Sequence, residues 1–240
     1  MKLTTDAINR LSTLIQTSMV AGLKKMIIEP GKIRGIDEKQ SVVVITTDNV
    51  PDLSGKSIGI TRIEQLSARL ALVGSQGDVA IEATETPSND ISILDLSSGK
   101  TKAQFRCATV EAVKGIPKNI TDVLVWEVAV NSKLLPTLTQ AVSAMSAETI
   151  TIASRDGASV SFECIDLNKD VFTTDAEDGP QWIGSGTPST SFVNKYPAKT
   201  LLGLLKEASK STDPVIIKIG QGGILSLKVN SFDFFVLPSQ

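Results

Sequence analysis

The pattern of apolar and polar residues in the first half of this chain returns in the second half. Apolar side chains at helical spacing predict helices over residues 7–19 and 62–73, and again over residues 134–145 and 198–210. Each predicted helix is followed by short apolar runs rich in β-branched residues, which predict strands. Helix, strands, helix and strands, twice over, indicate the duplication of one α+β unit.

Turn residues divide the apolar runs into hairpins. In one segment, by contrast, the apolar residues follow neither helical nor strand spacing. The expected strands are residues 26–34 as two strands about a turn, 42–45, 79–81 with 91–94, 123–130 as the counterpart of residues 1–5, 150–162 as a hairpin, and 215–219 with 224–227. This segment, residues 111–122, contains Pro117, which has no backbone N–H to donate to a neighbouring strand. We therefore predict an extended connector here. The expected organisation is an N-terminal domain over residues 1–110, this connector, and a C-terminal domain over residues 123–240.

The composition is that of a globular protein with aliphatic cores. Of the 240 residues, 41% are hydrophobic and only 4% are aromatic, so Ile, Leu and Val must fill the interior. The net charge of −2 and the pI near 5.3 exclude a protein that coats nucleic acid by bulk charge, although cations can still gather on one surface. Cys107 and Cys164 lie in strand-like runs, which favours buried free thiols over the alternative, a disulfide. With neither a signal-peptide pattern nor an apolar run of ~20 residues, we expect an intracellular protein without a membrane partner.

The chain contains no histidine. Ser-His-Asp and Cys-His nucleophile systems are therefore excluded, as are metal sites built on histidine. Three motifs have both a chemical and a structural interpretation: Ser54-Gly55-Lys56-Ser57 as a phosphate-binding or a polar loop, Gly220-Gln221-Gly222-Gly223 as a phosphate cradle or a hairpin turn, and residues 175–179 as a calcium loop or a solvated loop. The structural interpretation is favoured for each, because the first and third motifs lack part of the chemical pattern and the second lies between two alternating apolar runs. We expect no enzyme, no catalytic residue, no metal and no cofactor.

Basic residues lie on the polar sides of the predicted helices. In the fourth helix, Lys199, Gly203, Lys206 and Lys210 stand four, three and four residues apart, which makes one stripe. Such a stripe alone is most often a solvated face. The other predicted helices also carry or adjoin basic residues: Arg10, Arg62, Arg69 and Lys133. Together these positions favour an arrangement in which all four helices present cations toward a common space.

Four segments carry motifs whose order matches one known family. They are residues 134–162, Gly115-Ile116-Pro117 in the connector, residues 191–215 around the last helix, and Phe232-Asp233-Phe234-Phe235-Val236-Leu237-Pro238. In this order, and over essentially the whole chain, they resemble the two-domain DNA sliding clamps, the family of the proliferating cell nuclear antigen (PCNA) and its archaeal and viral relatives.

The resemblance implies duplicated sliding-clamp domains, with antiparallel sheets outside a ring and helices lining its hole. Two-domain clamps close as trimers, so the implied function is that of a homotrimeric DNA polymerase processivity factor. Its implied partners are double-stranded DNA held without sequence preference, a DNA polymerase, a clamp loader and further copies of the chain. The implied DNA-facing residues are Arg10, Arg62, Arg69, Lys133, Lys199, Lys206 and Lys210. Subunits are expected to join near residues 104–110 and 170–174.

The family also implies a pocket for partner peptides beneath the connector. By position, the matching residues are Ile36, Val43, Val113, Ile116, Ile120, Val236, Leu237 and Pro238. An exposed apolar pocket of this kind favours peptide capture. The alternative is that these residues only pack the connector onto the sheet.

The chain departs from the family in its charges and in one loop. The helices of the first half carry few cations, the third helix is preceded by Lys133 and has a neutral polar face, and residues 175–190 have no clear counterpart. An alternative function is therefore a specialised ring subunit, of checkpoint or late-transcription type, with different partners. A duplicated α+β enzyme is the alternative outside this class, and the absence of histidine disfavours it.

Overall fold

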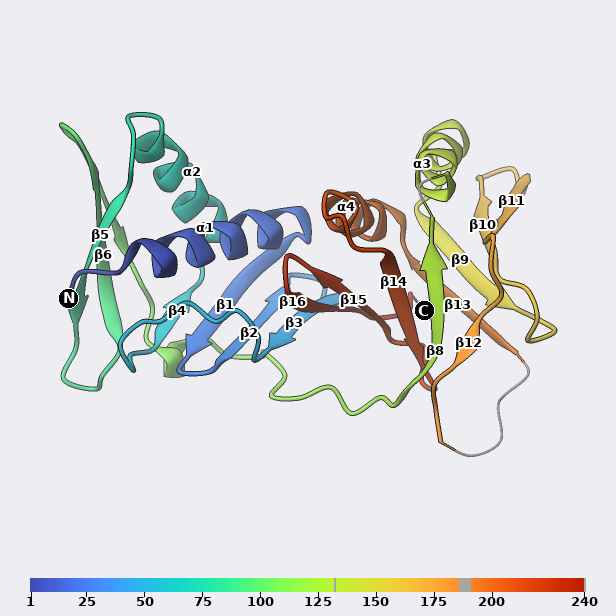
Figure 1. The fold of residues 1–240 in the computed structure, drawn as a ribbon, viewed down its shortest axis with the longest axis horizontal. Helices are drawn as coiled ribbons and strands as arrows, with labels where there is room; N and C mark the ends of the chain where they lie inside the picture. Colours follow the sequence, from blue (N-terminus) through green and yellow to red (C-terminus); the bar gives the residue numbers. More distant parts are fainter. Residues whose placement is uncertain (132, 186–190, 240) are drawn as a thin grey trace. The chain divides into compact units, whose positions relative to one another are not determined.

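The computed structural model describes residues 1–131, 133–185 and 191–239. It confirms the duplicated α+β architecture (Figure 1). The chain forms two compact units, unit 1 (Met1–Asn119) and unit 2 (Ile120–Gln240). The boundary between them falls inside residues 111–122, the segment predicted as the connector.

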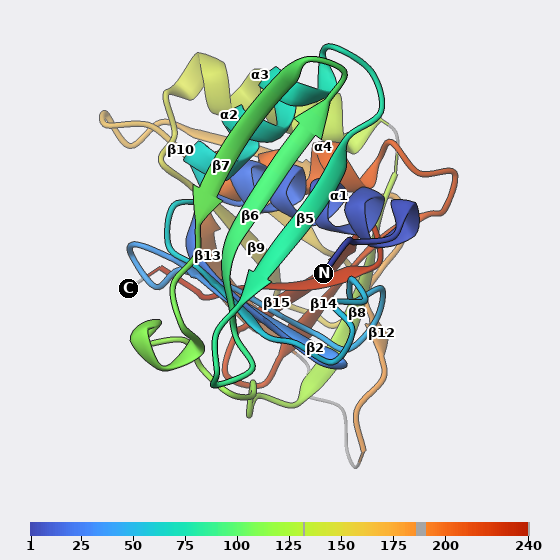
Figure 2. The same ribbon diagram turned by 90° about the vertical axis from the view of Figure 1, so that its left-hand side faces the viewer.

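Unit 1 consists of antiparallel strands with two helices packed on them. The strands follow the orders β4-β1-β2-β3 and β5-β6-β7, the second of which is seen in Figure 2. Its elements are α1 (Thr5–Val20), β1 (Leu23–Glu29), β2 (Lys32–Asp37), β3 (Val42–Thr46), β4 (Ile58–Ile60), α2 (Ile63–Gly74), β5 (Ala80–Glu85), β6 (Ile91–Ser98), β7 (Thr101–Arg106) and the 3-10 turn η1 (Val110–Ala112). The two helices contact each other, and α2 packs on β1, β6 and β7.

Unit 2 repeats this plan. Its strands follow the orders β13-β9-β10-β11 and β12-β8-β14-β15-β16, and its two helices also contact each other. The elements are β8 (Leu124–Val130), α3 (Leu134–Met145), β9 (Thr149–Ser154), β10 (Ser161–Ile165), β11 (Val171–Asp175), β12 (Gln181–Trp182), β13 (Phe192–Pro197), α4 (Ala198–Ala208), β14 (Val215–Gly220), β15 (Leu225–Val229) and β16 (Phe232–Val236). The first order matches β4-β1-β2-β3, and β14-β15-β16 matches β5-β6-β7, as a duplication requires.

The chain start differs from the expected strand over residues 1–5. Only Lys2 forms a β-bridge, with Glu82 of β5, and the helix already begins at Thr5. The N-cap is Thr4, whose side-chain oxygen accepts a hydrogen bond from the Ala7 amide at 3.2 Å.

The fourth helix is shorter than its sequence pattern. It ends at Ala208, so Lys210 of the predicted stripe lies in the turn beyond it. Leu201, Leu204 and Leu205 are 0% exposed, and burial of each such side chain stabilises the fold by about 1.5–3 kcal/mol. The helix therefore belongs to the core of unit 2 and leaves its other side to solvent.

The two cysteines are free thiols, as the sequence predicts. Cys164 is fully buried. Cys107 is half-buried, and burial raises the pKa of its thiol to about 12. Neither thiol is set up as a nucleophile.

In the described part of the chain, no helix has both the length and the apolar composition to cross a membrane.

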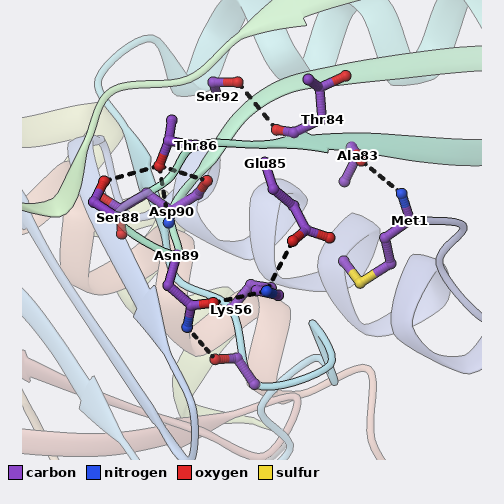
Figure 3. A network of polar contacts seen from close by, with 11 residues as sticks. Met1, Lys56, Ala83, Thr84, Glu85, Thr86, Ser88, Asn89, Asp90 and Ser92 are labelled. Carbon is purple, nitrogen blue, oxygen red and sulfur yellow. Dashed lines mark hydrogen bonds and ion pairs between the residues drawn. The ribbon is translucent and has the colours of Figure 1, made fainter.

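The loop that ends like a phosphate-binding motif is fastened within unit 1 (Figure 3). The Lys56 ammonium lies 2.8 Å from a Glu85 carboxylate oxygen and donates to the Asn89 side-chain oxygen at 2.7 Å. Asn89 donates in turn to the Gly55 carbonyl at 3.2 Å. Lys56 thus joins its loop to the turn between β5 and β6, in agreement with the structural interpretation.

The described part of residues 175–190 makes several contacts within unit 2, and residues 186–190 lie outside the described ranges. The short strand β12 pairs with β8, where the Trp182 ring meets Trp126 edge-on with centroids 5.0 Å apart. Glu177 accepts a hydrogen bond from the Asn131 side chain at 2.6 Å. The acidic part of this loop therefore serves as an attachment to unit 2.

Candidate DNA-facing and partner-binding surfaces

Unit 2 presents unpaired lysines on the solvent side of α4. Lys199 and Lys206 are exposed and lie seven residues apart, on the same side of the helix. Among the described residues, neither ammonium group has a hydrogen-bond or ion-pair partner. Lys210, beyond the helix, lies 2.6 Å from a Glu207 carboxylate oxygen. Lys133 is exposed at the start of α3.

The neighbouring helix α3 adds no charge to this surface. Its twelve residues, Leu134–Met145, include no Asp, Glu, Lys or Arg. An open groove of about 660 Å³ runs between α3 and α4, lined by Leu135, Pro136, Thr139, Gln140, Ser143, Ala144 and Lys206. The positive charge of the helix surface of unit 2 therefore comes from α4, the turn after it and the entry to α3.

In unit 1 the predicted DNA-facing cations already have partners. Arg10 forms an ion pair with Asp6, one helical turn away, at 2.8 Å. Arg62, at the N-cap of α2, and Arg69, within α2, both lie over the ring of Phe105 in β7, with guanidinium carbons 5.2 and 5.6 Å from the ring centroid. These arginines face the helix side of unit 1 but are held there by intramolecular contacts.

The connector is attached to unit 1 by two lysines. The Lys25 ammonium donates to the Lys114 carbonyl at 2.8 Å. The Lys32 ammonium donates to the Lys118 carbonyl at 2.8 Å and to the Asn119 side-chain oxygen at 3.1 Å. Charged donors thus hold the connector backbone beside β1 and β2.

Its other end is attached to unit 2 by a carboxylate. The Asp122 oxygens accept hydrogen bonds from the amides of Gly222 and Ile224 at 2.8 and 3.0 Å. A Cβ at Gly220 would overlap this carboxylate. The Gly220-Gln221-Gly222-Gly223 motif is a hairpin turn, as favoured, and it also holds an anion that belongs to the chain itself.

A buried tyrosine fixes the far side of this turn. The Tyr196 hydroxyl donates to the Gly223 carbonyl at 2.8 Å. Burial raises the pKa of Tyr196, and the negative charge of Asp122 adds to the shift. The phenol therefore stays protonated and keeps its hydrogen bond at neutral pH.

The residues assigned to the partner pocket fall in both units. In unit 1, Ile36 and Val43 are cross-strand partners in β2 and β3 and are 2% and 1% exposed. Val113 is buried against Gly59 of β4, whereas Ile116 is half-buried. Ile36 and Val43 are thus brought together, and only Ile116 of the four presents a sizeable surface in unit 1.

In unit 2, Val236 and its neighbours divide between two faces. Val236 is 0% exposed and points with Phe232 and Phe234 into the core. Alternation along β16 places Phe235 on the opposite face, where it is half-buried. The remaining predicted residues, Ile120, Leu237 and Pro238, are half-buried.

Phe235 belongs to an outer hollow of unit 2 that the sequence analysis did not identify. This hollow, of about 600 Å³, has a mixed lining of polar and apolar side chains, and the apolar ones include Leu124, Pro214, Ile216 and Phe235. Two cross-strand ion pairs flank it, Lys218 with Glu127 at 3.5 Å and Lys228 with Asp233 at 3.9 Å. The signal for Phe235 was the strict alternation of residues 232–236, which puts it opposite Val236.

Two edge strands leave their outer sides open. β7 ends the order β5-β6-β7, and β11 ends the order β13-β9-β10-β11. The opposite edges are partly covered, because the Leu3 amide donates to Ile81 of β5 and the Ser239 amide donates to Lys195 of β13. In the described residues no backbone segment pairs with the outer side of β7 or β11.

The two open edges carry opposite charges. β7 presents exposed Lys102 and Arg106, whereas exposed Asp170 and Asp175 stand at the two ends of β11. The β10–β11 hairpin also exposes apolar side chains, including Leu167 at 96% and Val171 at 58%. An edge of this composition is suited to contact with another chain.

Within the described residues, no group of three or more acidic or cysteine side chains could hold a metal ion. Comparison by sequence finds no matching family model and no matching curated protein.

Comparison by structure finds many similar chains. An A. fulgidus PCNA, solved with the C-terminal region of FEN-1, has a TM-score of 0.65 and 13% identity, over 100% of this chain and 97% of that one. The PCNA2–PCNA3 complex of Sulfolobus tokodaii gives 0.62 and 14%, over 99% of each chain. The β subunit of Pseudomonas aeruginosa DNA polymerase III gives 0.64 and 10%, over 100% of this chain and 66% of that one. The chain has the sliding-clamp fold.

Proposed function

We propose that the chain is a DNA polymerase processivity factor, a non-enzymatic sliding clamp that encircles duplex DNA as a closed homotrimer. The observation that carries the proposal is the similarity of fold over nearly the full length of a two-domain clamp. Each chain supplies two units of one plan, so three copies supply six. A closed ring holds DNA by topology, so strong binding by charge is not required of a protein with net charge −2.

Assembly is proposed to occur head to tail through the outer sides of β7 and β11. Both strands overlap the segments predicted from sequence, residues 104–110 and 170–174. Their opposite charges favour pairing of β7 of one copy with β11 of the next and disfavour pairing of like edges. Contacts of this type close into a ring when the rotation between copies permits it.

DNA is proposed to contact the helix surfaces without sequence preference. Lys199 and Lys206 are the strongest candidates for phosphate contacts because both are exposed and unpaired among the described residues. Lys133 and Lys210 are secondary candidates, and the arginines of unit 1 contribute less because Asp6 and Phe105 already hold them. Phosphate contacts of this kind weaken as salt rises.

Partner proteins, including a polymerase and a clamp loader, are proposed to dock beside the connector. The A. fulgidus PCNA binds the C-terminal region of FEN-1, which is a precedent for peptide capture by this fold. Within unit 2, Ile120, the tail residues Leu237 and Pro238, and the hollow at Phe235 supply apolar surface.

The decisive experiment is native mass spectrometry followed by a loading assay. We expect a trimer of a 25.5 kDa chain, and processive synthesis on a long primed template only when a polymerase, a loader and ATP are present. A monomer at micromolar concentration, or equal synthesis without the chain, would contradict the proposal. Phe235→Ala should lower polymerase stimulation but leave the trimer intact, whereas Val193→Ala, at an exposed position of β13, is the matched control.

A second candidate is a specialised ring subunit, of checkpoint or late-transcription type, with different partners. It is favoured by the uncharged helix α3 and by the intramolecular pairing of the unit 1 arginines, both of which reduce DNA contacts. The S. tokodaii complex is a precedent for rings built from different chains of this fold. Assembly only on addition of a second clamp-like chain would favour this candidate over the homotrimer.

A further inference from the structure

Two arginines, Arg62 at the N-cap of α2 and Arg69 within it, contact β7, the strand whose outer side is open. Phe105 lies in the middle of the packing between α2 and β7 and is 1% exposed. Arg62 and Arg69 approach its ring within 5.2 and 5.6 Å. Two cations over one buried ring fix the position of β7 relative to α2.

Arg62 also reaches the backbone of β7. Its Nη2 donates to the Arg106 carbonyl at 2.8 Å. The Cys107 amide donates to Ser92 of β6 at 2.8 Å, and successive residues of a strand direct their backbone groups to opposite sides. The Arg106 carbonyl therefore points to the outer side of β7. Arg62 occupies an acceptor that a strand pairing with β7 would otherwise use.

Beyond Arg106 the chain has a backbone partner of its own. The Ala108 amide donates to the Gly59 carbonyl at 2.8 Å, and the Gly59 amide donates back at 3.1 Å. A Cβ at Gly59 would lie 2.7 Å from the Ala108 carbonyl oxygen, so this close approach requires glycine. The outer side of β7 is consequently open up to Gln104 and occupied from Arg106 onward.

We infer that Arg62, supported by Arg69, is a positioning residue for self-assembly, which holds β7 in place and sets where its pairing with a second copy of the chain ends. Arg62 has this role only if β7 is a contact between copies, so the inference rests on the proposed function. It gives Arg62 a task that differs from the DNA contact expected from the sequence. A guanidinium already bound to a ring and a carbonyl has less capacity left for a phosphate.

Cys107 supplies a reporter at the same end of β7. Burial is the main cause of its raised pKa, and the nearby Arg62 charge opposes that shift. Removal of the Arg62 charge alone would therefore slow the reaction of Cys107 with a thiol reagent. A faster reaction would instead report that the strand end has loosened. Cys164, which is fully buried, is the internal reference.

The experiment compares Arg62→Met and Arg62→Lys with Lys206→Met, which removes an unpaired cation from unit 2. Self-association is measured by sedimentation without DNA, and thiol modification is measured under the same conditions. We expect Arg62→Met to weaken association about tenfold and to speed Cys107 modification severalfold, since it loses the ring contact and the carbonyl hydrogen bond. Lys206→Met should change neither measurement and should lower DNA retention.

Arg62→Lys separates charge from geometry. Lysine keeps the cation but not the planar fork that lies on the ring and reaches the carbonyl. We expect DNA retention per ring to stay close to that of the unchanged protein while association is still weakened. Full association with Arg62→Met and an unchanged Cys107 rate would overturn the inference and return Arg62 to the DNA surface.

The design also separates this inference from the proposed function. If the protein without any substitution remains monomeric, that result contradicts both the proposed ring and the role of Arg62 in pairing between copies. Association weakened equally by Arg62→Met and Lys206→Met would contradict the specific role of Arg62 while leaving the ring proposal in place. The thermal midpoint of each variant guards against a general loss of folding.

Discussion

Units 1 and 2 share one plan of strands and helices but use charge differently. In unit 1, Arg10, Arg62 and Arg69 are bound to an aspartate or to an aromatic ring. In unit 2, Lys199 and Lys206 project from α4 without partners among the described residues. The shared fold determines where the helix surface lies, whereas local acids and rings determine whether a cation on it can bind anything else.

The two ends of the connector show the same contrast. In unit 1, the ammonium groups of Lys25 and Lys32 bind backbone carbonyls. In unit 2, backbone amides bind the carboxylate of Asp122. Both units therefore keep the same framework, but the connector is held by cationic side chains of unit 1 at one end and by its own carboxylate at the other.

The largest expected effect follows from removal of the ring that holds the unit 1 arginines. Phe105→Ala should lower the free energy of unfolding by about 3–5 kcal/mol, because it leaves a cavity in the core beneath α2. Urea unfolding measures the loss. Phe235→Ala, at a half-buried ring on an outer face, should cost much less, and equal losses would contradict the assignment of Phe105 to the core.

Loss of the carboxylate at the unit 2 end of the connector should have the next largest effect. Asp122→Ala should destabilise the fold by about 1–3 kcal/mol, because two amides lose a charged acceptor. Hydrogen exchange should be faster at Gly222 and Ile224. Asp178→Ala, at an exposed aspartate, is the control and should change neither quantity. Unchanged protection at both amides would show that the turn does not depend on Asp122.

DNA binding should be more sensitive to the unpaired lysines than to the paired arginine. Lys199→Gln and Lys206→Gln should each reduce the salt dependence of DNA binding by about one counterion. Arg10→Gln should reduce it less, because Asp6 already neutralises that charge. Titrations of a duplex at several salt concentrations measure the slopes. An equal change for all three would contradict the contrast between the units.

The smallest expected effect concerns the unit 1 end of the connector. Lys25→Met with Lys32→Met should leave the free energy of unfolding almost unchanged, because exposed charged contacts contribute little. Trypsin should cut the freed connector after Lys114 and Lys118 severalfold faster. Lys39→Met is the control and should leave the cleavage rate unaltered. If the double variant at Lys25 and Lys32 is also cleaved no faster, the two lysines do not restrain the connector.

The sequence was most informative where a pattern repeats over several turns. The bounds of α3 were predicted without error, because Leu134 and Leu138 are buried at helical spacing. The pattern of α4 was extended too far, since a lysine at the right spacing does not distinguish the helix from the turn after it. Helix ends depend on single hydrogen bonds, such as the one to Thr4, which periodicity does not encode.

The candidate surfaces were only partly predictable for a related reason. The sequence shows that the residues near the C-terminal end are apolar, but not which of them face solvent. In β16 the side chain of Val236 points into the core and that of Phe235 points to the opposite face. The pairing of Arg62 with Phe105 and Arg106 joins residues far apart in the chain, and no local pattern marks it. Sequence identified which residues are basic, and only the fold determines which of them are already engaged.

Because Gly220 has no side chain, substitutions at this position have an effect on a distant segment of the chain. The space that the absent side chain leaves is filled by a carboxylate whose hydrogen-bonded amide, at Gly222, lies 100 residues away along the chain. Any larger residue there would displace Asp122, so a substitution in a hairpin of β14 and β15 should reproduce the defect of a change in the connector. A mutational screen would then group two distant segments under one phenotype.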